Sequence, residues 1–168
     1  MNACPASPAL VVAAEDPAGA DAQALMAALS CTLAAITGSD GRASFDVDEV
    51  RGERARFVVA RDAQGRALGC GALRPLAAAG VTDEIAEIKR MFAVPGTAGV
   101  GSAVLSFLEA EAARLGYTHA WLETRLVNAR AVAFYERRGY ARIENYGRYR
   151  GNGAAVCFGK GLDVGAAA

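Results

Sequence analysis

The glycine-rich stretch "VPGTAGVGSAVL", residues 94–105, constrains the fold of this chain more than any other segment. Residues 85–94 alternate like a strand, and an apolar run with helical spacing follows Gly96, Gly99 and Gly101. A bare loop between a strand and a helix exposes backbone N–H groups at the positive end of the helix dipole. The stretch therefore predicts an anion-binding loop inside an α/β domain.

The composition limits the kinds of protein to which such a loop can belong. The chain has 168 residues, 53% of them hydrophobic, which suits one domain over 1–168 with a frayed tail at 163–168. Its 18 basic and 18 acidic residues cancel, so the chain lacks the strongly basic field that nucleic-acid binding needs. We therefore expect no nucleic-acid partner.

The cysteines and the first apolar run indicate the compartment. No metal site is expected, because the chain has one histidine and its cysteines show no CxxC or CxxxC spacing. The four cysteines are Cys4, Cys31, Cys70 and Cys157. The apolar run at 9–14 is interrupted by Glu15 and Asp16, far short of the ~20 residues that span a bilayer. We expect a soluble, cytoplasmic protein with reduced thiols and no membrane partner.

The first half of the chain predicts a strand, a helix, a loop and a β-hairpin, in that order, over residues 9–14, 17–38, 39–55 and 56–76. Asp16 is the expected helix N-cap, Pro17 the first helical residue and Gly38 the residue that ends the helix. The loop is expected to contain one short helical turn around 47–50.

The second half alternates strands and helices. Residues 85–94 form the strongest strand candidate, and strict alternation would place Ile88, Arg90, Phe92 and Val94 on one face and Glu87, Lys89 and Met91 on the other. The elements expected after the glycine-rich loop are a helix ending at Gly116, a strand at 119–125, a helix from Asn128 to Gly139, and strands at 140–149 and 154–162.

Three phosphate-binding loops compete for the glycine-rich stretch. A Walker loop, GxxxxGK[ST], matches Gly96 and Gly101, but Ser102 stands where the lysine is required. A dinucleotide loop, GxGxxG, matches Gly99 and Gly101, but Val104 replaces the third glycine. The third candidate depends on the neighbouring residues.

Those neighbours carry a family resemblance. The segment "AEIKRMFAVPGTAGVGSAVLSFLEAEAARLGY", followed by "NARAVAFYERRGY", resembles the GCN5-related N-acetyltransferase (GNAT) family over 85–140 and more loosely over 154–162, roughly half of the chain. The resemblance implies the GNAT fold, an α/β fold with a mixed, mostly antiparallel sheet of about six or seven strands flanked by helices. It also implies acetyl transfer from acetyl-coenzyme A (acetyl-CoA) to a primary amine of a small molecule or peptide.

In this family the cofactor's pyrophosphate is bound by a loop of the pattern [QR]xxGx[GA]. The first position of that pattern is Gly96 in this chain. The missing side chain leaves backbone amides and the Ser102 hydroxyl as the expected ligands, over Ala98, Gly99, Val100, Gly101 and Ser102. One lost charged hydrogen bond weakens binding by about 1.5–3 kcal/mol, so we expect reduced affinity rather than none.

The resemblance implies further contacts to the cofactor. Met91, Phe92 and Val94 are expected along the pantetheine arm, and Asn128 and Arg130 are expected to reach the cofactor from the second helix of the motif. For Asn128 an ordinary N-cap is the alternative, and one residue can do both.

Amide formation from a thioester requires a base for the ammonium, an acid for the thiolate and a donor for the carbonyl. The resemblance implies Tyr135 as the acid, and packing with Ala131 and Arg138 on one helix face is the alternative. The resemblance also implies Glu87 as the base, because some family members have a glutamate at a similar place, and a salt bridge with Lys89 is the alternative. The donor would be a main-chain N–H near Phe92.

Two rival functions stay open. Gly96 suggests a non-catalytic acyl-CoA-binding or sensing module, which the presence of Tyr135 opposes. A phosphate- or nucleotide-binding domain is opposed by the absence of GK[ST]. The acceptor amine is expected to be selected by 38–56 and the C-terminal hairpin. Exposed edge strands favour a homodimer.

Overall fold

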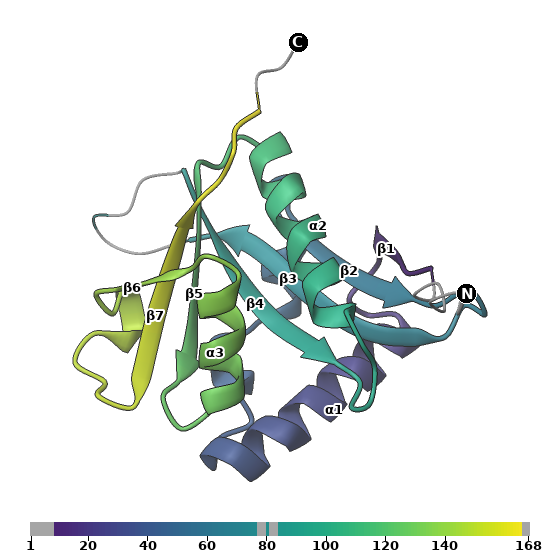
Figure 1. The fold of residues 1–168 in the computed structure, drawn as a ribbon, viewed down its shortest axis with the longest axis horizontal. Coiled ribbons are helices and arrows are strands. Elements are labelled where there is room, and N and C mark those ends of the chain that lie inside the picture. Colours follow the sequence, from purple (N-terminus) through teal and green to yellow (C-terminus); the bar gives the residue numbers. More distant parts are fainter. Residues whose placement is uncertain (1–8, 77–79, 81–83, 166–168) are drawn as a thin grey trace, which may run out of the picture.

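The described residues form one seven-stranded sheet flanked by three α-helices (Figure 1). The computed structural model describes residues 9–76, 80 and 84–165. The strand order is β1-β2-β3-β4-β5-β7-β6, and among these strands only β4 and β5 pair in parallel. The expected mixed, mostly antiparallel sheet is confirmed. The elements are β1 (Val11–Ala14), α1 (Ala20–Thr37), β2 (Arg56–Arg61), β3 (Ala67–Pro75), β4 (Ile85–Ala93), α2 (Val100–Arg114), β5 (His119–Arg125), α3 (Ala129–Arg137), β6 (Ala141–Ile143) and β7 (Ala155–Gly161).

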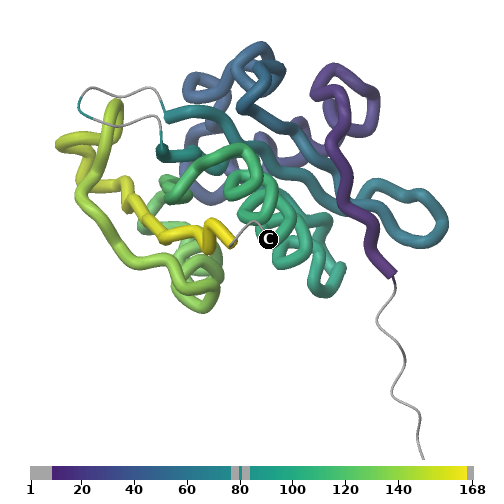
Figure 2. The backbone as a smooth tube through the Cα atoms, turned by 90° about the horizontal axis from the view of Figure 1, so that it is seen from above, coloured from purple at the N-terminus to yellow at the C-terminus, as the bar shows by residue number. Residues whose placement is uncertain are grey.

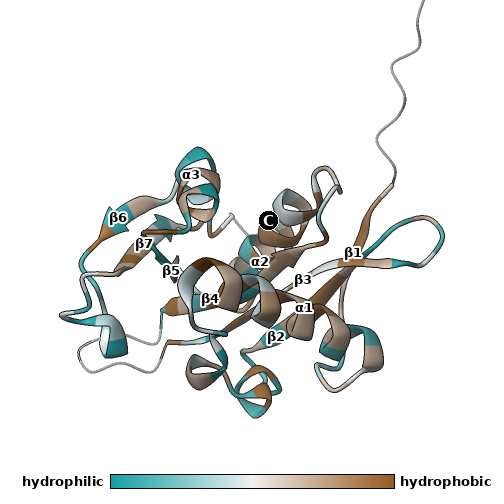
Figure 3. Ribbon diagram, turned by 90° about the horizontal axis from the view of Figure 1, so that it is seen from below, coloured by the Kyte–Doolittle hydropathy of each residue, from teal (hydrophilic) through white to brown (hydrophobic). Residues whose placement is uncertain are grey.

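The helices cover opposite faces of the sheet (Figure 2). On the α2 and α3 face, a large core joins apolar residues of the helices to the strands, including Val104, Leu105, Leu108, Leu122 and Phe158. On the other face, α1 packs Leu25 and Met26 against β2 and β3. Figure 3 shows the hydrophobic residues along the strands, whereas α3 and the turn between β2 and β3 carry hydrophilic ones.

The α2 helix approaches β3 closely at Gly71. A Cβ atom added there would lie 2.7 Å from the Met91 sulfur, 2.8 Å from Val104 Cγ1 and 2.9 Å from Leu108 Cδ1. Real Cβ atoms essentially never come so near, so only glycine lets the helix pack at this distance. This close packing positions the start of α2 relative to β4.

The α1 helix begins later than the sequence predicts. Gly19 is the N-cap, and no side chain in the described part of the chain caps it. Asp16 Oδ1 accepts a hydrogen bond from the Ala18 N–H at 2.9 Å, which closes a turn before the helix. The prediction of Asp16 as the cap and Pro17 as the first helical residue is therefore wrong. Gly38 ends the helix with a φ of 76°, as predicted.

Within the described residues, α1 is one helix that is long and apolar enough to cross a membrane by length and composition alone. Core helices of soluble proteins pass the same test, so this evidence is weak. Leu25, Met26 and Leu29 are buried in the protein, which gives the apolar composition a packing role.

A bulge in β4 overturns the predicted faces of this strand. Cys70 pairs with Phe92 and Ala72 with Lys89, so Arg90 and Met91 together oppose Gly71. Arg90 adopts a φ of 53°, unusual for a residue with a side chain. Ile88 and Met91 consequently pack on the α2 face, whereas Arg90, Phe92 and Val94 lie on the α1 face. Strict alternation along the strand was thus a wrong expectation.

The C-terminal region contains less strand than predicted. β6 spans Ala141–Ile143, and a 3-10 helix at Gly147–Tyr149 replaces the second half of the predicted strand at 140–149. The reason is packing, because Tyr146 and Tyr149 turn inward and are buried near Trp121. Residues 163–165 are exposed after β7, whereas Cys4 and residues 166–168 of the expected tail lie outside the described residues.

Candidate active site

The parallel strands β4 and β5 separate toward their carboxyl ends. Their described pairing ends at Glu87 and Trp121, although β4 continues to Ala93 and β5 to Arg125. Figure 1 shows the two strands diverging toward the loops that precede α2 and α3. Backbone polar groups of β4 after Glu87 are thus not paired with β5, and they are available to a ligand.

A tight turn accounts for the glycine at position 96. The Thr97 N–H donates to the Val94 carbonyl oxygen at 3.2 Å, and Gly96, which follows Pro95, has a φ of 82°. Proline at the second position and a positive φ at the third are the features of a type II β-turn. A long side chain at position 96 would be strained, so glycine suits this loop better than the Gln or Arg of the motif.

The α2 helix starts directly after this turn with free backbone donors. Gly99 is the N-cap with a φ of 74°, and no side chain of the described residues caps it. The Ala103 N–H is bonded to the Gly99 carbonyl oxygen at 3.0 Å, and the earlier amides lie in the first turn, where a helix offers them no acceptor. This helix end is suited to bind a phosphate.

Arg138 brings a positive charge to the same helix end. It is the C-cap of α3, its Nη2 donates to the Ser102 hydroxyl, and its Cζ lies 5.5 Å from the centroid of the Phe134 ring. The sequence analysis assigned no cofactor role to this residue, because Arg138 and Ser102 are 36 positions apart and meet only when α3 packs on α2. The chain therefore has a cation at the start of α2 although Gly96 supplies none.

The α3 helix begins at the opening between β4 and β5. Asn128 Oδ1 accepts a hydrogen bond from the Ala131 N–H at 3.3 Å, so the ordinary N-cap role is confirmed. Arg130 is exposed in the first turn of the same helix. Their contacts to a cofactor stay predictions.

Tyr135 lies in the core beneath α3. Its ring centroid is 5.1 Å from Phe134, 5.7 Å from Tyr140 and 6.2 Å from Phe158, and the residue is 8% exposed. Burial raises the pKa of its phenol well above the usual value, so the hydroxyl stays protonated at neutral pH. A buried, protonated hydroxyl is a proton donor held in a fixed position.

Glu87 lies on the opposite side of β4 and is held by two cations. Its Oε1 is 3.1 Å from Arg74 Nη2 and 3.2 Å from Lys89 Nζ, and the residue is 3% exposed. The salt bridge with Lys89, the alternative stated for this residue, is confirmed, and Arg74 is a second partner. Lys89 Nζ also donates to the Tyr149 hydroxyl at 3.0 Å.

Glu123 on β5 is a candidate that sequence reasoning missed. Its Oε1 is buried and finds no hydrogen-bond partner among the described residues; Arg125 Nη1 is 3.5 Å away. Desolvation raises the pKa of this carboxyl, and Glu87 adds to the effect, while Arg125, Lys89 and Arg148 oppose it. Alternation in "WLETR" was the available signal, because it places Glu123 opposite the core residue Leu122.

The residues expected along the pantetheine arm lie on both sides of β4. Met91 packs toward α2, whereas Phe92 and Val94 pack toward α1. Their role therefore depends on the backbone edge of the strand as much as on side chains, and it stays a prediction.

The described residues contain no group of three or more His, Cys, Asp or Glu side chains that could hold a metal ion. Cys70 and Cys157 are buried, and burial raises the pKa of the Cys70 thiol to about 12. Such a thiol is protonated and unreactive at neutral pH.

Residues 24–140 match the family model described as the Acetyltransferase (GNAT) family. Because the match covers more than half of the chain, the chain belongs to this family. The family resemblance seen in the sequence is thus confirmed.

Individual relatives agree with this assignment. The IAA acetyltransferase of Azospirillum brasilense is 35% identical over 96 residues, which are 56% of this chain and 60% of that protein. The uncharacterized N-acetyltransferase YjgM of Escherichia coli strain K12 is 32% identical over 83 residues, 48% of each chain. The chain thus spans about half the length of the curated relatives that it matches.

A solved structure from Klebsiella pneumoniae, described as an acyl-CoA N-acyltransferase, superposes with a TM-score of 0.75 and 26% identity. The likeness covers 91% of this chain and 97% of that one. The expected GNAT fold is therefore confirmed.

Proposed function

We propose that this protein transfers the acetyl group of acetyl-CoA to a primary amine. The observation that carries the proposal is the opening between β4 and β5, which has an uncapped helix N-terminus beside it and buried acid and base groups on its two faces. Membership in the acetyltransferase family supports acyl transfer in general.

The residues at this opening fit the chemistry of the cofactor. Backbone amides between Ala98 and Ser102 and the Ser102 hydroxyl bind the pyrophosphate, and Arg138 supplies the charge that the motif normally takes from position 96. The other residues assigned to the cofactor are Gly99, Val100 and Gly101 in the loop and helix start, Met91, Phe92 and Val94 on β4, and Asn128 and Arg130 on α3.

Acetyl-CoA supplies the thioester carbonyl that a neutral amine attacks. Glu123 accepts the proton that the ammonium loses, because its carboxyl is desolvated and its Oε1 lacks a hydrogen-bond partner among the described residues. Tyr135 donates a proton to the departing sulfur and takes up the second proton that the nitrogen loses as the amide forms, so a C–N bond replaces the C–S bond, a free thiol leaves and Tyr135 ends protonated. A backbone N–H of β4 near Phe92 polarises the carbonyl oxygen.

Glu87 remains the second candidate for the base. Its Oε1 already accepts a hydrogen bond from Arg74 and forms an ion pair with Lys89, so it is less free to take a proton than Glu123. Both carboxylates lie on the same face, and the energetic coupling between them allows either to receive the proton directly or through water.

The main alternative is a non-catalytic acyl-CoA-binding module, for which Gly96 is the argument. Tyr135 and Glu123 favour an enzyme, because the buried Tyr135 hydroxyl stays protonated and the raised pKa of Glu123 lies closer to neutral pH than that of an ordinary carboxyl. A cytoplasmic location and a homodimer through an edge strand, β1 or β6, are parts of the same proposal.

Thermal unfolding of the protein with acetyl-CoA tests the cofactor assignment, with ATP and Mg²⁺ as the control. A ligand at 100 times its Kd adds about 2.7 kcal/mol to the free energy of unfolding, which raises Tm by about 5–10 °C. A shift with acetyl-CoA alone supports the proposal. A shift with ATP and Mg²⁺ alone contradicts it and favours a nucleotide-binding domain.

A further inference from the structure

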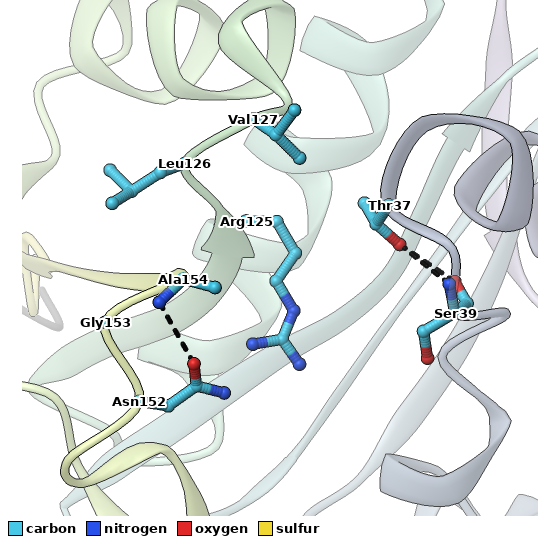
Figure 4. A pocket seen from close by; sticks show the side chains of 8 residues that line it. All are labelled: Thr37, Ser39, Arg125, Leu126, Val127, Asn152, Gly153 and Ala154. Atoms are coloured by element: carbon cyan, nitrogen blue, oxygen red, sulfur yellow. Dashed lines mark hydrogen bonds between the residues drawn. The ribbon is translucent and has the colours of Figure 1, made fainter.

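A pocket of about 470 Å³ opens at the carboxyl end of β5 (Figure 4). Three separate segments line it: the end of α1 with Thr37 and Ser39, residues 125–127, and residues 152–154. The volume lies in the range of small-molecule sites. Because residues alternate along β5, Arg125 shares a strand face with Glu123, so the pocket lies beside the proposed base.

The Arg125 side chain extends into this pocket between the end of α1 and Asn152 (Figure 4). It is 31% exposed, and its polar partner within the described residues is Glu123 Oε1 at 3.5 Å, an ion pair without a hydrogen bond. A guanidinium carries five N–H donors in a planar fork that matches a carboxylate. Among the described residues that line the pocket none is acidic, so the pocket favours an anionic group.

The same pocket has an apolar rim. Leu126 and Val127 are 45% and 66% exposed, and they are among the large hydrophobic side chains that the described surface leaves in solvent. Two adjacent exposed hydrophobic residues beside a guanidinium that makes no side-chain hydrogen bond within the described part of the chain suit a ligand that combines an apolar group with a carboxylate.

The spacing of Glu123 and Arg125 limits the size of that ligand. Residues two apart on a strand are separated by about 7 Å along one face. A molecule whose amine meets Glu123 and whose carboxylate meets Arg125 therefore carries these two groups only a few ångströms apart. An α-amino acid meets this requirement, whereas the N-terminus of a long peptide has its carboxylate far away.

We propose that the acceptor is a free amino acid with an apolar side chain, held by Arg125 through its carboxylate and by Leu126 and Val127 through its side chain. This inference rests on the proposed acetyl transfer and narrows its substrate. The ammonium group first passes one proton to Glu123, and the neutral nitrogen then forms the new C–N bond as the C–S bond breaks. The nitrogen's second proton replaces the one that Tyr135 gives to the sulfur, and the products are an N-acetyl amino acid and free CoA.

Three acceptors that share the same aromatic group test the inference: phenylalanine, phenylalanine amide and phenethylamine. Each is incubated with saturating acetyl-CoA, and the rate of CoA thiol release is measured. We expect kcat/KM for phenylalanine to exceed that for the other two by about 10- to 100-fold, the effect of a charged hydrogen-bonded pair. Arg125→Gln should remove this preference, and Arg125→Lys should restore part of it. The control is Arg142→Gln, which removes an exposed arginine paired with Glu136 and should keep the preference.

The outcomes separate two failures. Equal kcat/KM for phenylalanine and its amide, or an acid preference that persists in Arg125→Gln, overturns the amino-acid inference and leaves acetyl transfer standing. Binding of acetyl-CoA without turnover of any of the three acceptors overturns the amino-acid inference. A screen of other primary amines then tests acetyl transfer separately: turnover of one of them keeps it, and turnover of none contradicts it.

Discussion

The two faces of the sheet differ in how they are assembled. The proposed cofactor site comes from one continuous segment, 91–140, in which the end of β4, the loop, α2, β5 and α3 follow each other. The acceptor face combines the end of α1, parts of β4 and β5, and residues 152–154, which meet only in the folded protein. The proposed cofactor site is therefore encoded in a local motif, whereas the proposed acceptor site depends on tertiary packing and can change through a few scattered residues.

The faces also differ in polarity. Toward α2 the interior is aliphatic and aromatic, whereas the other face of β4 holds Glu87, Lys89 and Arg90. Arg90 Nη2 donates to the Met26 carbonyl oxygen at 3.0 Å and to Ser30 Oγ at 2.8 Å, and these bonds hold the bulge against α1. An apolar side suits a thioester arm, and a charged side suits proton transfer and recognition of a polar acceptor.

The largest effect is expected from Tyr135→Phe on the cofactor face. The substitution keeps the aromatic packing but removes the proton donor, so kcat should fall by about 10²- to 10⁴-fold, while Kd for acetyl-CoA and Tm change little. Steady-state kinetics with isothermal titration measure both. Tyr140→Phe is the matched control. The Tyr140 hydroxyl donates a hydrogen bond to Glu109 Oε1 at 2.9 Å, and this contact lies away from the opening. A kcat of Tyr135→Phe within twofold of wild type would remove Tyr135 from the mechanism.

A comparison of two carboxylates sharpens the account of the acceptor face. Glu123→Gln should lower kcat by about 100-fold, because the amide cannot accept the proton of the ammonium. Glu87→Gln should have a smaller effect on kcat and a larger effect on Tm, because it weakens a buried cluster with Arg74 and Lys89. A larger loss of kcat from Glu87→Gln would make Glu87 the base.

Arg138 supplies a positive charge at the start of α2, whereas the motif normally has a Gln or Arg at position 96. Arg138→Ala should raise Kd for acetyl-CoA by about tenfold, because a charge beside Ser102 at the start of α2 is lost. Arg137→Ala removes a neighbouring exposed arginine of the same helix end and should leave Kd unchanged. Equal effects of the two substitutions would indicate a general electrostatic attraction rather than a specific contact.

The smallest effect is on stability as a function of pH. Because the pKa of Glu123 is raised in the folded protein, the ionised carboxylate opposes folding above that pKa. Glu123→Gln should therefore raise Tm by about 2–4 °C at pH 8, and the gain should vanish as pH falls below the usual value of 4.5. Thermal unfolding across this pH range is the measurement. A lower Tm at pH 8 would mean that the ion pair with Arg125 outweighs desolvation.

The sequence predicted the loop and helix boundaries of the α2 and α3 face well because each of their signals is local. Gly99 before α2, Asn128 before α3 and Gly139 after it act through their own backbone or nearest neighbours, and the loop motif is contiguous. The prediction of Asp16 as the N-cap of α1 was wrong for a local reason as well. An aspartate side chain can form an Asx turn or cap a helix, and the sequence does not distinguish the two.

The remaining features depend on contacts between distant segments. The bulge at Arg90 follows from pairing with β3 and from the bonds of its guanidinium to α1, neither of which alternation can indicate. The contact of Arg138 with Ser102 needs the packing of α3 on α2. The pocket around Arg125 needs three segments that are far apart in the chain.

The measurement that tests the central claim most directly is mass spectrometry of a mixture of free amino acids incubated with acetyl-CoA and the protein. We expect a single class of N-acetylated product, amino acids with apolar side chains, together with stoichiometric free CoA, and formation of both about 10²- to 10⁴-fold slower with Tyr135→Phe. Unchanged amino acids and intact acetyl-CoA, under conditions where the protein binds acetyl-CoA, would contradict an amino-acid acceptor.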